Sequence, residues 1–201
     1  VGKWHLGLDT DYPKLRMHAL NRGFDECYKF MGRGGHDYFQ LRGVKGPEYA
    51  PIYRNKERIK EGDYEGYLTT RLTEEAVAFI DRQKQKPFFL YLTHYTVHTP
   101  IQAKDELTKK YKAKPTHGGH VNAKYAAMIE SMDDSIGAVL AKLKELELDD
   151  NTMVLFFSDN GGHGGVTSNA PLRGSKGMLY EGGIREPLVI KWPGVTKAGT
   201  T

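Results

Sequence analysis

The sequence predicts an α/β protein, a three-layer sandwich around a mostly parallel central sheet, and three observations lead to this prediction. Residues 153–157 are an unbroken apolar run, which is typical of a strand buried on both faces in the middle of a parallel sheet. A second run of this kind covers residues 87–95, and a third covers residues 188–192. One helical pattern precedes the run at residues 87–95 and another lies between that run and residues 153–157, and such alternation of strands and helices is characteristic of α/β architecture.

Two long helices are expected between the strands. Residues 67–85 place their apolar side chains on one helical stripe, and Thr69 or Thr70 is a suitable N-cap. Residues 122–147 have the clearest helical periodicity of the chain, and the Asp133 and Asp134 pair fits a solvated face there. A shorter polar helix is expected at residues 104–112. The stripe of the first helix consists of Leu68, Leu72, Ala76, Phe79 and Ile80. This first helix is interpreted as scaffold.

The composition limits the classes of function. The 201 residues suffice for one domain with a sizeable core, and the net charge of +4 is modest and dispersed. This distribution disfavours nucleic acid as a partner and is compatible with a small anionic or sulfated substrate. Cys27 is the single cysteine, which excludes an internal disulfide, and no apolar run approaches the ~18 residues of a membrane span. The chain begins with Val1 rather than Met, and we interpret it as a fragment.

Oxygen-bearing side chains follow the expected central strand. Asp159 and Asn160 come shortly after residues 153–157, and Gly161 and Gly162 let the backbone turn sharply. In open α/β sheets ligands bind at the carboxyl ends of the strands. Carboxylate and amide oxygens are hard ligands that suit Ca²⁺ or Mg²⁺ rather than Zn²⁺. The alternative interpretation is a plain turn after a strand.

A glycine-rich loop with two cations, Arg173 and Lys176, lies further along the chain. Backbone N–H groups and the Lys176 ammonium can hold an anion in such a loop. A divalent cation at Asp159 and Asn160, together with this lysine, implies an anionic group between them. The alternative is that Lys176 is a solvated loop charge, because short motifs carry a real false-positive risk.

Lys3, His5 and His98 are further candidate site residues. Lys3 and His5 are two positions apart, so in an extended segment their side chains point to one face. His94 and His98 lie in an extended segment, where their rings would be about 13 Å apart, too far for one metal ion. His98, close to the turn at Pro100, is therefore the better candidate, and His94 is expected to pack or to form a local hydrogen bond.

Three other histidines and one aromatic stretch are less specific. His117 and His120 lie among glycines and are expected in a mobile surface loop. His163 either contacts a sugar hydroxyl or caps a turn. Residues 8–67 show little periodicity. Long loop segments of this kind determine specificity more often than they form part of the core. Within them, residues 36–39 follow the glycines Gly32, Gly34 and Gly35 and are expected to border a sugar.

These motifs together resemble those of the type I sulfatases, the formylglycine-dependent members of the alkaline phosphatase superfamily. The matching segments run nearly end to end and occur in the right order, which is more specific than any single motif. They are residues 2–7 (GKWHLG), 97–100 (VHTP), 125–130 (YAAMIE), 158–162 (SDNGG), 172–177 (LRGSKG) and 180–185 (YEGGIR). The resemblance implies an alkaline phosphatase-like fold. Residues 1–201 would then be a partial catalytic domain, without the N-terminal segment and the C-terminal subdomain.

The resemblance also implies roles for the candidate residues. Lys3 would contact the sulfate and the nucleophile, and His5 would hold the hydroxyl of the nucleophile and help to collapse the sulfated intermediate. His98 would bind the sulfate near its bridging oxygen and assist the leaving alcohol. Lys176 would be a second cation on the sulfate. Hydrolysis of a sulfate ester builds negative charge on the equatorial and leaving oxygens, which these groups would stabilise.

The metal and the supporting residues follow from the same resemblance. Asp159 and Asn160 would be two ligands of a Ca²⁺ ion, with Mg²⁺ as the second choice. The side chains that would shape the surrounding loop are Arg173, Glu181 and Arg185. His163 would add a substrate contact.

Two features of the family are not found in this sequence. Cys27 precedes Tyr28 and Lys29, which does not match the Cys/Ser-x-Pro/Ala-x-Arg motif that is modified to formylglycine. The first pair of metal-binding aspartates is absent as well. Both lie upstream of Val1 in the family, so we expect the formylglycine there and expect the fragment to be inactive alone.

Three functional readings remain at this point. The leading one is a sulfuric ester hydrolase that removes sulfate from a carbohydrate or an aryl sulfate. The resemblance implies that it acts in the periplasm or outside the cell. The second is a phosphodiesterase or phosphonate monoester hydrolase of the same superfamily. The third is a non-catalytic binder of sulfated glycans that kept the anion site. The oligomeric state does not follow from the sequence.

Overall fold

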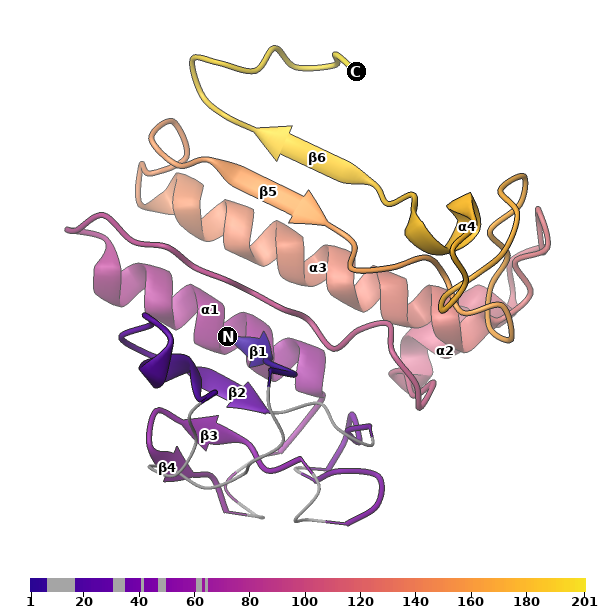
Figure 1. The fold of residues 1–201 in the computed structure, drawn as a ribbon, viewed down its shortest axis with the longest axis horizontal. Helices are drawn as coiled ribbons and strands as arrows, with labels where there is room; N and C mark the ends of the chain where they lie inside the picture. The colour runs from indigo at the N-terminus through magenta and orange to yellow at the C-terminus, as the bar shows by residue number, and fades with distance from the viewer. Residues whose placement is uncertain (7–16, 31–34, 41, 47–49, 61–62, 64) are drawn as a thin grey trace.

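The computed structural model describes residues 1–6, 17–30, 35–40, 42–46, 50–60, 63 and 65–201 (Figure 1). Gly7, Gly32 and Gly34, which the sequence motifs include, lie outside these ranges. The strands are β1 (Gly2–Lys3), β2 (Tyr28–Phe30), β3 (Tyr53–Arg54), β4 (Glu57–Arg58), β5 (Val154–Phe157) and β6 (Leu188–Lys191). The helices are α1 (Leu68–Gln83), α2 (Asp105–Lys112), α3 (Ala123–Glu145) and the short α4 (Glu181–Ile184). In the described part of the chain, none of the helices combines the length and the apolar character that crossing a membrane requires.

The α/β class expected from the sequence is confirmed, and the strands pair in a mixed fashion. One sheet has the order β1-β2-β3-β4, with β1 parallel to β2 and the other neighbours antiparallel. Thr93 forms a parallel bridge to Gly2 on the other side of β1, so part of the run at residues 87–95 extends this sheet. The second sheet is the antiparallel pair of β5 and β6. Figure 1 shows α1 and α3 side by side between the two sheets.

The expected helices are present, with one correction. α1, α2 and α3 occupy the predicted positions, and Asn122 caps α3 by accepting a hydrogen bond from the Tyr125 backbone N–H at 3.1 Å. The prediction of Thr69 or Thr70 as the cap of α1 is wrong, since the N-cap is Tyr67 and it makes no side-chain cap bond. Thr69 lies inside the helix and is buried, because its hydroxyl hydrogen-bonds to Thr96 in the neighbouring segment.

The core is rich in aromatic side chains and lies between the first sheet, α1 and α3. Its buried members are Tyr28, Phe30, Tyr38, Ile52, Tyr67, Leu68, Leu72, Tyr95, Ala103, Ala127 and Met128. Tyr38 is stacked on Tyr67 with 5.4 Å between the ring centroids, and it lies 5.2 Å from Tyr95. Such aromatic pairs add to the stability that apolar burial provides.

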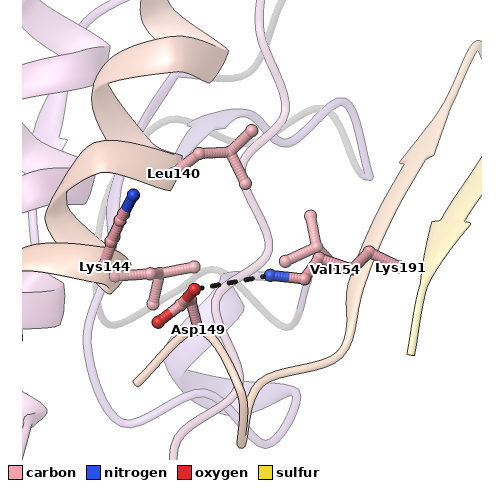
Figure 2. Close-up of a pocket in the computed structure, with 6 residues that line it drawn as sticks. Leu140, Lys144, Asp149, Val154 and Lys191 are labelled. Atoms are coloured by element: carbon pink, nitrogen blue, oxygen red, sulfur yellow. Dashed lines mark ion pairs between the residues drawn. The ribbon is translucent and has the colours of Figure 1, made fainter. Parts of the chain in front are cut away.

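The expected burial of residues 153–157 on both faces is not observed. Val154 faces α3, where it lines a cavity of about 200 Å³ with Leu140 and Leu143 (Figure 2). The alternate residues Leu155 and Phe157 are 52% and 64% exposed. Because successive side chains of a strand point to opposite faces, one face of β5 packs on α3, and nothing in the described residues covers the other.

Candidate functional site

The strand β1 delivers Lys3 and His5 to one edge of the first sheet. The Lys3 backbone N–H donates to the Thr93 carbonyl at 2.9 Å, and the Thr93 hydroxyl donates to the Lys3 carbonyl at 2.7 Å. A Cβ atom at Gly2 would lie 2.0 Å from the Thr93 carbonyl oxygen, so this close pairing requires glycine. His5 has a left-handed φ of 50°. The extended geometry assumed for Lys3 and His5 therefore ends before His5.

The buried ring of Tyr95 lies beside the side chains of both Lys3 and His98. The Lys3 ammonium nitrogen lies 5.7 Å from the centre of the Tyr95 ring, and the His98 ring lies 4.9 Å from it at 32°. The Tyr95 hydroxyl donates to the Thr99 carbonyl at 2.6 Å and accepts from the His36 backbone N–H at 3.0 Å. Burial raises the pKa of Tyr95 to about 12, so the hydroxyl stays protonated and keeps donating at neutral pH. Tyr95 was not predicted as a site residue, because nothing local in the sequence distinguishes it from a core residue.

His98 is held in one tautomer by its neighbour. Its Nδ1 atom lies 2.7 Å from the Thr99 carbonyl oxygen, which only accepts hydrogen bonds, so Nδ1 carries the proton. Nε2 is therefore the nitrogen that is available to a ligand. The Tyr38 hydroxyl lies 2.9 Å from the His98 carbonyl oxygen and fixes the backbone at this point. His94, in contrast, bonds through Nε2 to the Ser135 hydroxyl of α3 at 3.2 Å, so it packs within the fold as expected, but its hydrogen bond is made to a residue 41 positions away.

Asp159 and Asn160 lie at the carboxyl end of β5, as expected. Asp159 is exposed, and the Asn160 side-chain N–H donates to the Gly161 carbonyl at 3.1 Å. This bond uses the amide nitrogen, so Oδ1 is the donor atom that Asn160 can offer to a metal. The Gly161 backbone N–H donates to the Gly183 carbonyl at 3.1 Å, which joins this turn to α4. The cavity of Figure 2 lies at the opposite end of β5, by Val154, and is separate from these residues.

The Lys176 loop is joined to the same turn. The Lys176 backbone N–H donates to the Gly162 carbonyl at 3.1 Å, and the Gly182 N–H donates to the Arg173 carbonyl at 2.8 Å. The Arg173 guanidinium lies 3.9 Å from the centre of the Tyr180 ring. Glu181 and Arg185 form an exposed ion pair at 3.3 Å. The loop therefore presents Lys176, which is itself exposed, beside the Asp159 turn.

Electrostatic effects connect side chains from three distant parts of the chain. Burial lowers the pKa of Lys3, Lys176 lowers it further, and Asp159 raises it. Burial also lowers the pKa of His5, with the same opposing contributions from the two lysines and Asp159. The pKa of His98 is lowered first by burial and then by Lys3 and Lys176, while Asp159 raises it. Lys3, His5 and His98 thus all lie within electrostatic range of Lys176 and Asp159.

Other histidines lie outside this group. His163 accepts a hydrogen bond from the Gly165 backbone N–H at 3.1 Å, which corresponds to the turn cap considered for it. His117 and His120 flank a tight turn rather than a loose loop, with 2.9 Å between the His120 N–H and the His117 carbonyl. His120 Nδ1 also lies 3.0 Å from the Thr167 hydroxyl. The sequence did not indicate this contact between distant loops.

The expectation for residues 36–39 is largely wrong. His36 and Tyr38 are fully buried, and the His36 ring lies 4.8 Å from that of Phe30. Both side chains are turned into the aromatic core, where burying them is more favourable than exposing them to a sugar. Phe39, at 46% exposure, remains available at the surface.

The donor set suits a hard metal ion only in part. Asp159 and Asn160 supply a carboxylate and an amide oxygen, the ligand types that Ca²⁺ prefers, whereas Ca²⁺ takes six to eight oxygens. In the part of the chain that the structure describes, no three His, Cys, Asp or Glu side chains gather as a metal site. The two residues are therefore compatible with a metal that takes its further ligands from elsewhere.

The fold and this grouping of charges define an α/β protein with a candidate anion site at the carboxyl ends of its strands. The family model described as Sulfatase matches residues 1–201. The chain belongs to the sulfatase family, which agrees with the resemblance seen in the sequence and with the alkaline phosphatase-like fold.

Known relatives are longer than this chain. A sulfatase of Formosa agariphila is 44% identical over 73% of the chain, which covers 30% of that protein. Human N-acetylgalactosamine-6-sulfatase is 35% identical over 99% of the chain and 38% of that protein. The solved structure of Ps i-CgsB in complex with k-i-k-neocarrahexaose is 36% identical, with a TM-score of 0.81, and 96% of this chain matches 44% of that one. The chain thus spans less than half the length of these relatives.

Proposed function

We propose that the intact protein is a sulfuric ester hydrolase that removes sulfate from a sulfated carbohydrate or an aryl sulfate. The main support is that Lys176 and Asp159 each shift the pKa of Lys3, His5 and His98, and that Lys3 also lowers the pKa of both histidines. These residues are up to 173 positions apart, since the set runs from Lys3 to Lys176. Family membership supports the reaction class, and the carbohydrate is suggested by relatives such as N-acetylgalactosamine-6-sulfatase.

The two lysines would bind the sulfate group, and the two histidines would act on the leaving group and on the nucleophile. Lys3 and Lys176 would hold the sulfate group from two sides and offset the negative charge that develops on its oxygens. His98 would direct Nε2 at the bridging oxygen, because Nδ1 is occupied by the Thr99 carbonyl. His5 would hold the hydroxyl of the nucleophile. In the free protein the two lysines lower the pKa of His98, and an anionic substrate would act in the opposite direction.

Asp159 and Asn160 would hold a Ca²⁺ ion, which stabilises negative charge on the sulfate when it is bound. The nucleophile would be a formylglycine outside residues 1–201, and the 201-residue chain is a partial catalytic domain that we expect to be inactive alone. His163 would contribute a substrate contact. The protein would act in the periplasm or outside the cell, where sulfated glycans occur.

Activity of the full-length protein tests this proposal. We expect hydrolysis of nitrophenyl sulfate in the presence of Ca²⁺ and much slower hydrolysis of nitrophenyl phosphate. Lys176→Ala and His98→Ala should each lower kcat/KM by about 10²–10⁴-fold, the usual cost of losing a charge-stabilising or proton-transferring group. Lys197→Ala, at an exposed lysine that follows β6, is the matched control and should leave kcat/KM unchanged.

Two results would contradict the proposal. Preferential hydrolysis of the phosphate ester would assign the site to phosphoester chemistry instead. Binding of a sulfated oligosaccharide without turnover, by a full-length protein that lacks the Cys-x-Pro-x-Arg segment, would identify a non-catalytic binder.

A further inference from the structure

The side chain of Asn169 makes a two-point contact with the backbone of Gly162. The Gly162 N–H donates to Asn169 Oδ1 at 2.9 Å, and Asn169 Nδ2 donates to the Gly162 carbonyl at 2.9 Å. The two bonds run in opposite directions, as between paired strands, so the amide group of Asn169 takes the place of a partner peptide. The orientation of this amide follows from its partners, because an N–H must face an oxygen and a carbonyl must face an N–H.

The contact depends on glycine at position 162. A Cβ atom there would lie 2.5 Å from Thr167 Cγ2 and 2.8 Å from Asn169 Oδ1, which is closer than atoms of this kind approach. The Gly162 carbonyl accepts a second hydrogen bond, from the Lys176 backbone N–H at 3.1 Å. Gly162 is therefore the point where the Asp159 turn, the Asn169 side chain and the Lys176 loop are joined.

Asn169 is in turn held by its own loop. Its backbone carbonyl accepts a hydrogen bond from the Leu172 N–H at 2.9 Å, at the start of the segment that leads to Arg173 and Lys176. The amide thus has a fixed position from which to hold Gly162. Outer residues that orient the ligands of a metal are commonly worth about 10–100-fold in metal affinity or activity.

We propose that Asn169 is a positioning residue that fixes the Asp159 and Asn160 turn relative to Lys176. This inference rests on the proposed function, because it assigns to those residues the binding of the metal and of the sulfate. Asn169 itself contacts neither ligand. It acts through Gly162, whose N–H and carbonyl it holds at once, and it thereby keeps the metal ligands and the lysine at a constant separation.

The experiment compares Asn169→Ala with Ser168→Ala in the full-length protein. Ser168 is the adjacent polar residue, and its hydroxyl accepts a local bond from the Ala170 N–H, at 3.2 Å. Asn169→Ser is a second variant that keeps a polar group in the loop but cannot span both Gly162 groups. Calorimetric titration with Ca²⁺, hydrogen exchange of the peptides that contain Gly162 and Lys176, melting temperature and nitrophenyl sulfate kinetics are measured for each.

Both Asn169 variants should bind Ca²⁺ about 10–100-fold more weakly and lose a similar factor in kcat. Their Gly162 and Lys176 amides should exchange faster, while the far end of β5 keeps its protection and the melting temperature falls little. Ser168→Ala should match the wild type in all four measurements. A merely structural role would instead lower the melting temperature and leave the Ca²⁺ affinity of the folded protein unchanged.

The proposed function and the role of Asn169 fail in different ways. If the wild type neither binds Ca²⁺ nor hydrolyses the sulfate ester, the proposed function is wrong, and the assigned role of Asn169 falls with it. If the wild type does both and the Asn169 variants match Ser168→Ala in affinity and exchange, only the role of Asn169 is wrong.

Discussion

The two ends of the chain differ in how their apolar side chains are used. Among the described residues, every buried apolar side chain lies between Ala19 and Leu143. Residues 153–192, here called the C-terminal region, instead carry exposed apolar side chains, which include Leu155, Phe157, Leu188, Val189 and Trp192. The candidate site takes residues from both parts. Residues 19–143, here called the packed region, supply the buried Tyr95 ring beside which Lys3 and His98 lie. Asp159 and Lys176, in contrast, are positioned by backbone hydrogen bonds among glycines.

This contrast indicates that stability and site geometry have different origins here. Burial of apolar area is non-directional and favours a well-packed core. Hydrogen bonds between backbone groups of close-packed glycines contribute less to stability but fix positions in space. Substitutions in the packed region should therefore act on stability, and substitutions at Gly162 and its partners should act on the site.

The largest expected difference is in the free energy of unfolding, between alanine variants of Leu72 and of Leu155. Leu72 is fully buried in α1, so Leu72→Ala should lower the free energy of unfolding by about 2–5 kcal/mol. Leu155 is 52% exposed, and Leu155→Ala in the 201-residue chain should cost less than about 1 kcal/mol. Urea denaturation of both variants measures this. Equal costs would contradict the contrast, and a larger cost for Leu155→Ala in the full-length protein would show that its face is covered there.

The ion pairs of Glu75 in the packed region should contribute more to stability than the exposed pair of Glu181 and Arg185. Glu75 is 7% exposed and pairs with both Arg54 and Arg71, the latter at 2.9 Å. Glu75→Gln should destabilise the protein by about 1–3 kcal/mol, because the charge-assisted hydrogen bonds to Arg54 and Arg71 are weakened. Glu181→Gln removes an exposed partner of Arg185 and should cost at most about 1 kcal/mol. If added salt lowered the stability of the wild type more than that of Glu75→Gln, the Glu75 pairs would be no better shielded than surface ones.

The packed region should also set the acid sensitivity of folding. Burial lowers the pKa of His94 from 6.5 to about 4, and burial lowers that of His18 to about 4 as well. The unfolded chain therefore binds protons more readily than the folded one between these values. Stability should be fully present above pH 6.5 and should fall as the pH decreases toward about 4. His94→Gln should reduce the slope of the unfolding free energy against pH in this window. His18 should contribute to the remaining slope, together with His5 and His98, whose pKa values burial also lowers.

The smallest expected effect is a gain in stability within α3. Gly137 lies in the interior of this helix, its φ is not in the left-handed region, and a Cβ atom there would meet nothing within 4 Å. Gly137→Ala should stabilise the protein by about 0.5–1 kcal/mol, because alanine loses less conformational freedom on folding. Ala141→Gly, at an exposed position of the same helix, should have the opposite effect of similar size. A rise in melting temperature for Ala141→Gly would contradict this account.

The sequence predicted the helices well and the details of the loops poorly. The stripe of α1 and the long periodicity of α3 were visible because one face of each helix is buried, and this imposes a repeat on the sequence. The cap of α1 was misassigned because Thr69 is turned inward by a bond to Thr96, a residue 27 positions away. His36 and Tyr38 were placed at a surface for a similar reason. Their burial depends on Phe30 and Tyr95, which no local pattern connects to them.

The sequence by itself determined the positions of α1, α2 and α3 and the chemistry that follows β5, since apolar periodicity and the run Asp159-Asn160-Gly161-Gly162 are local properties. The short strands β2, β3 and β4 lie in a stretch with little periodicity and were not predicted. The tertiary structure alone decided that Lys3 and His98 lie over Tyr95, that Lys176 joins Gly162, and that Asn169 holds this junction. The physical reason is that these contacts are short-ranged in space but join positions far apart in the chain, and only folding brings such positions within hydrogen-bonding or electrostatic range.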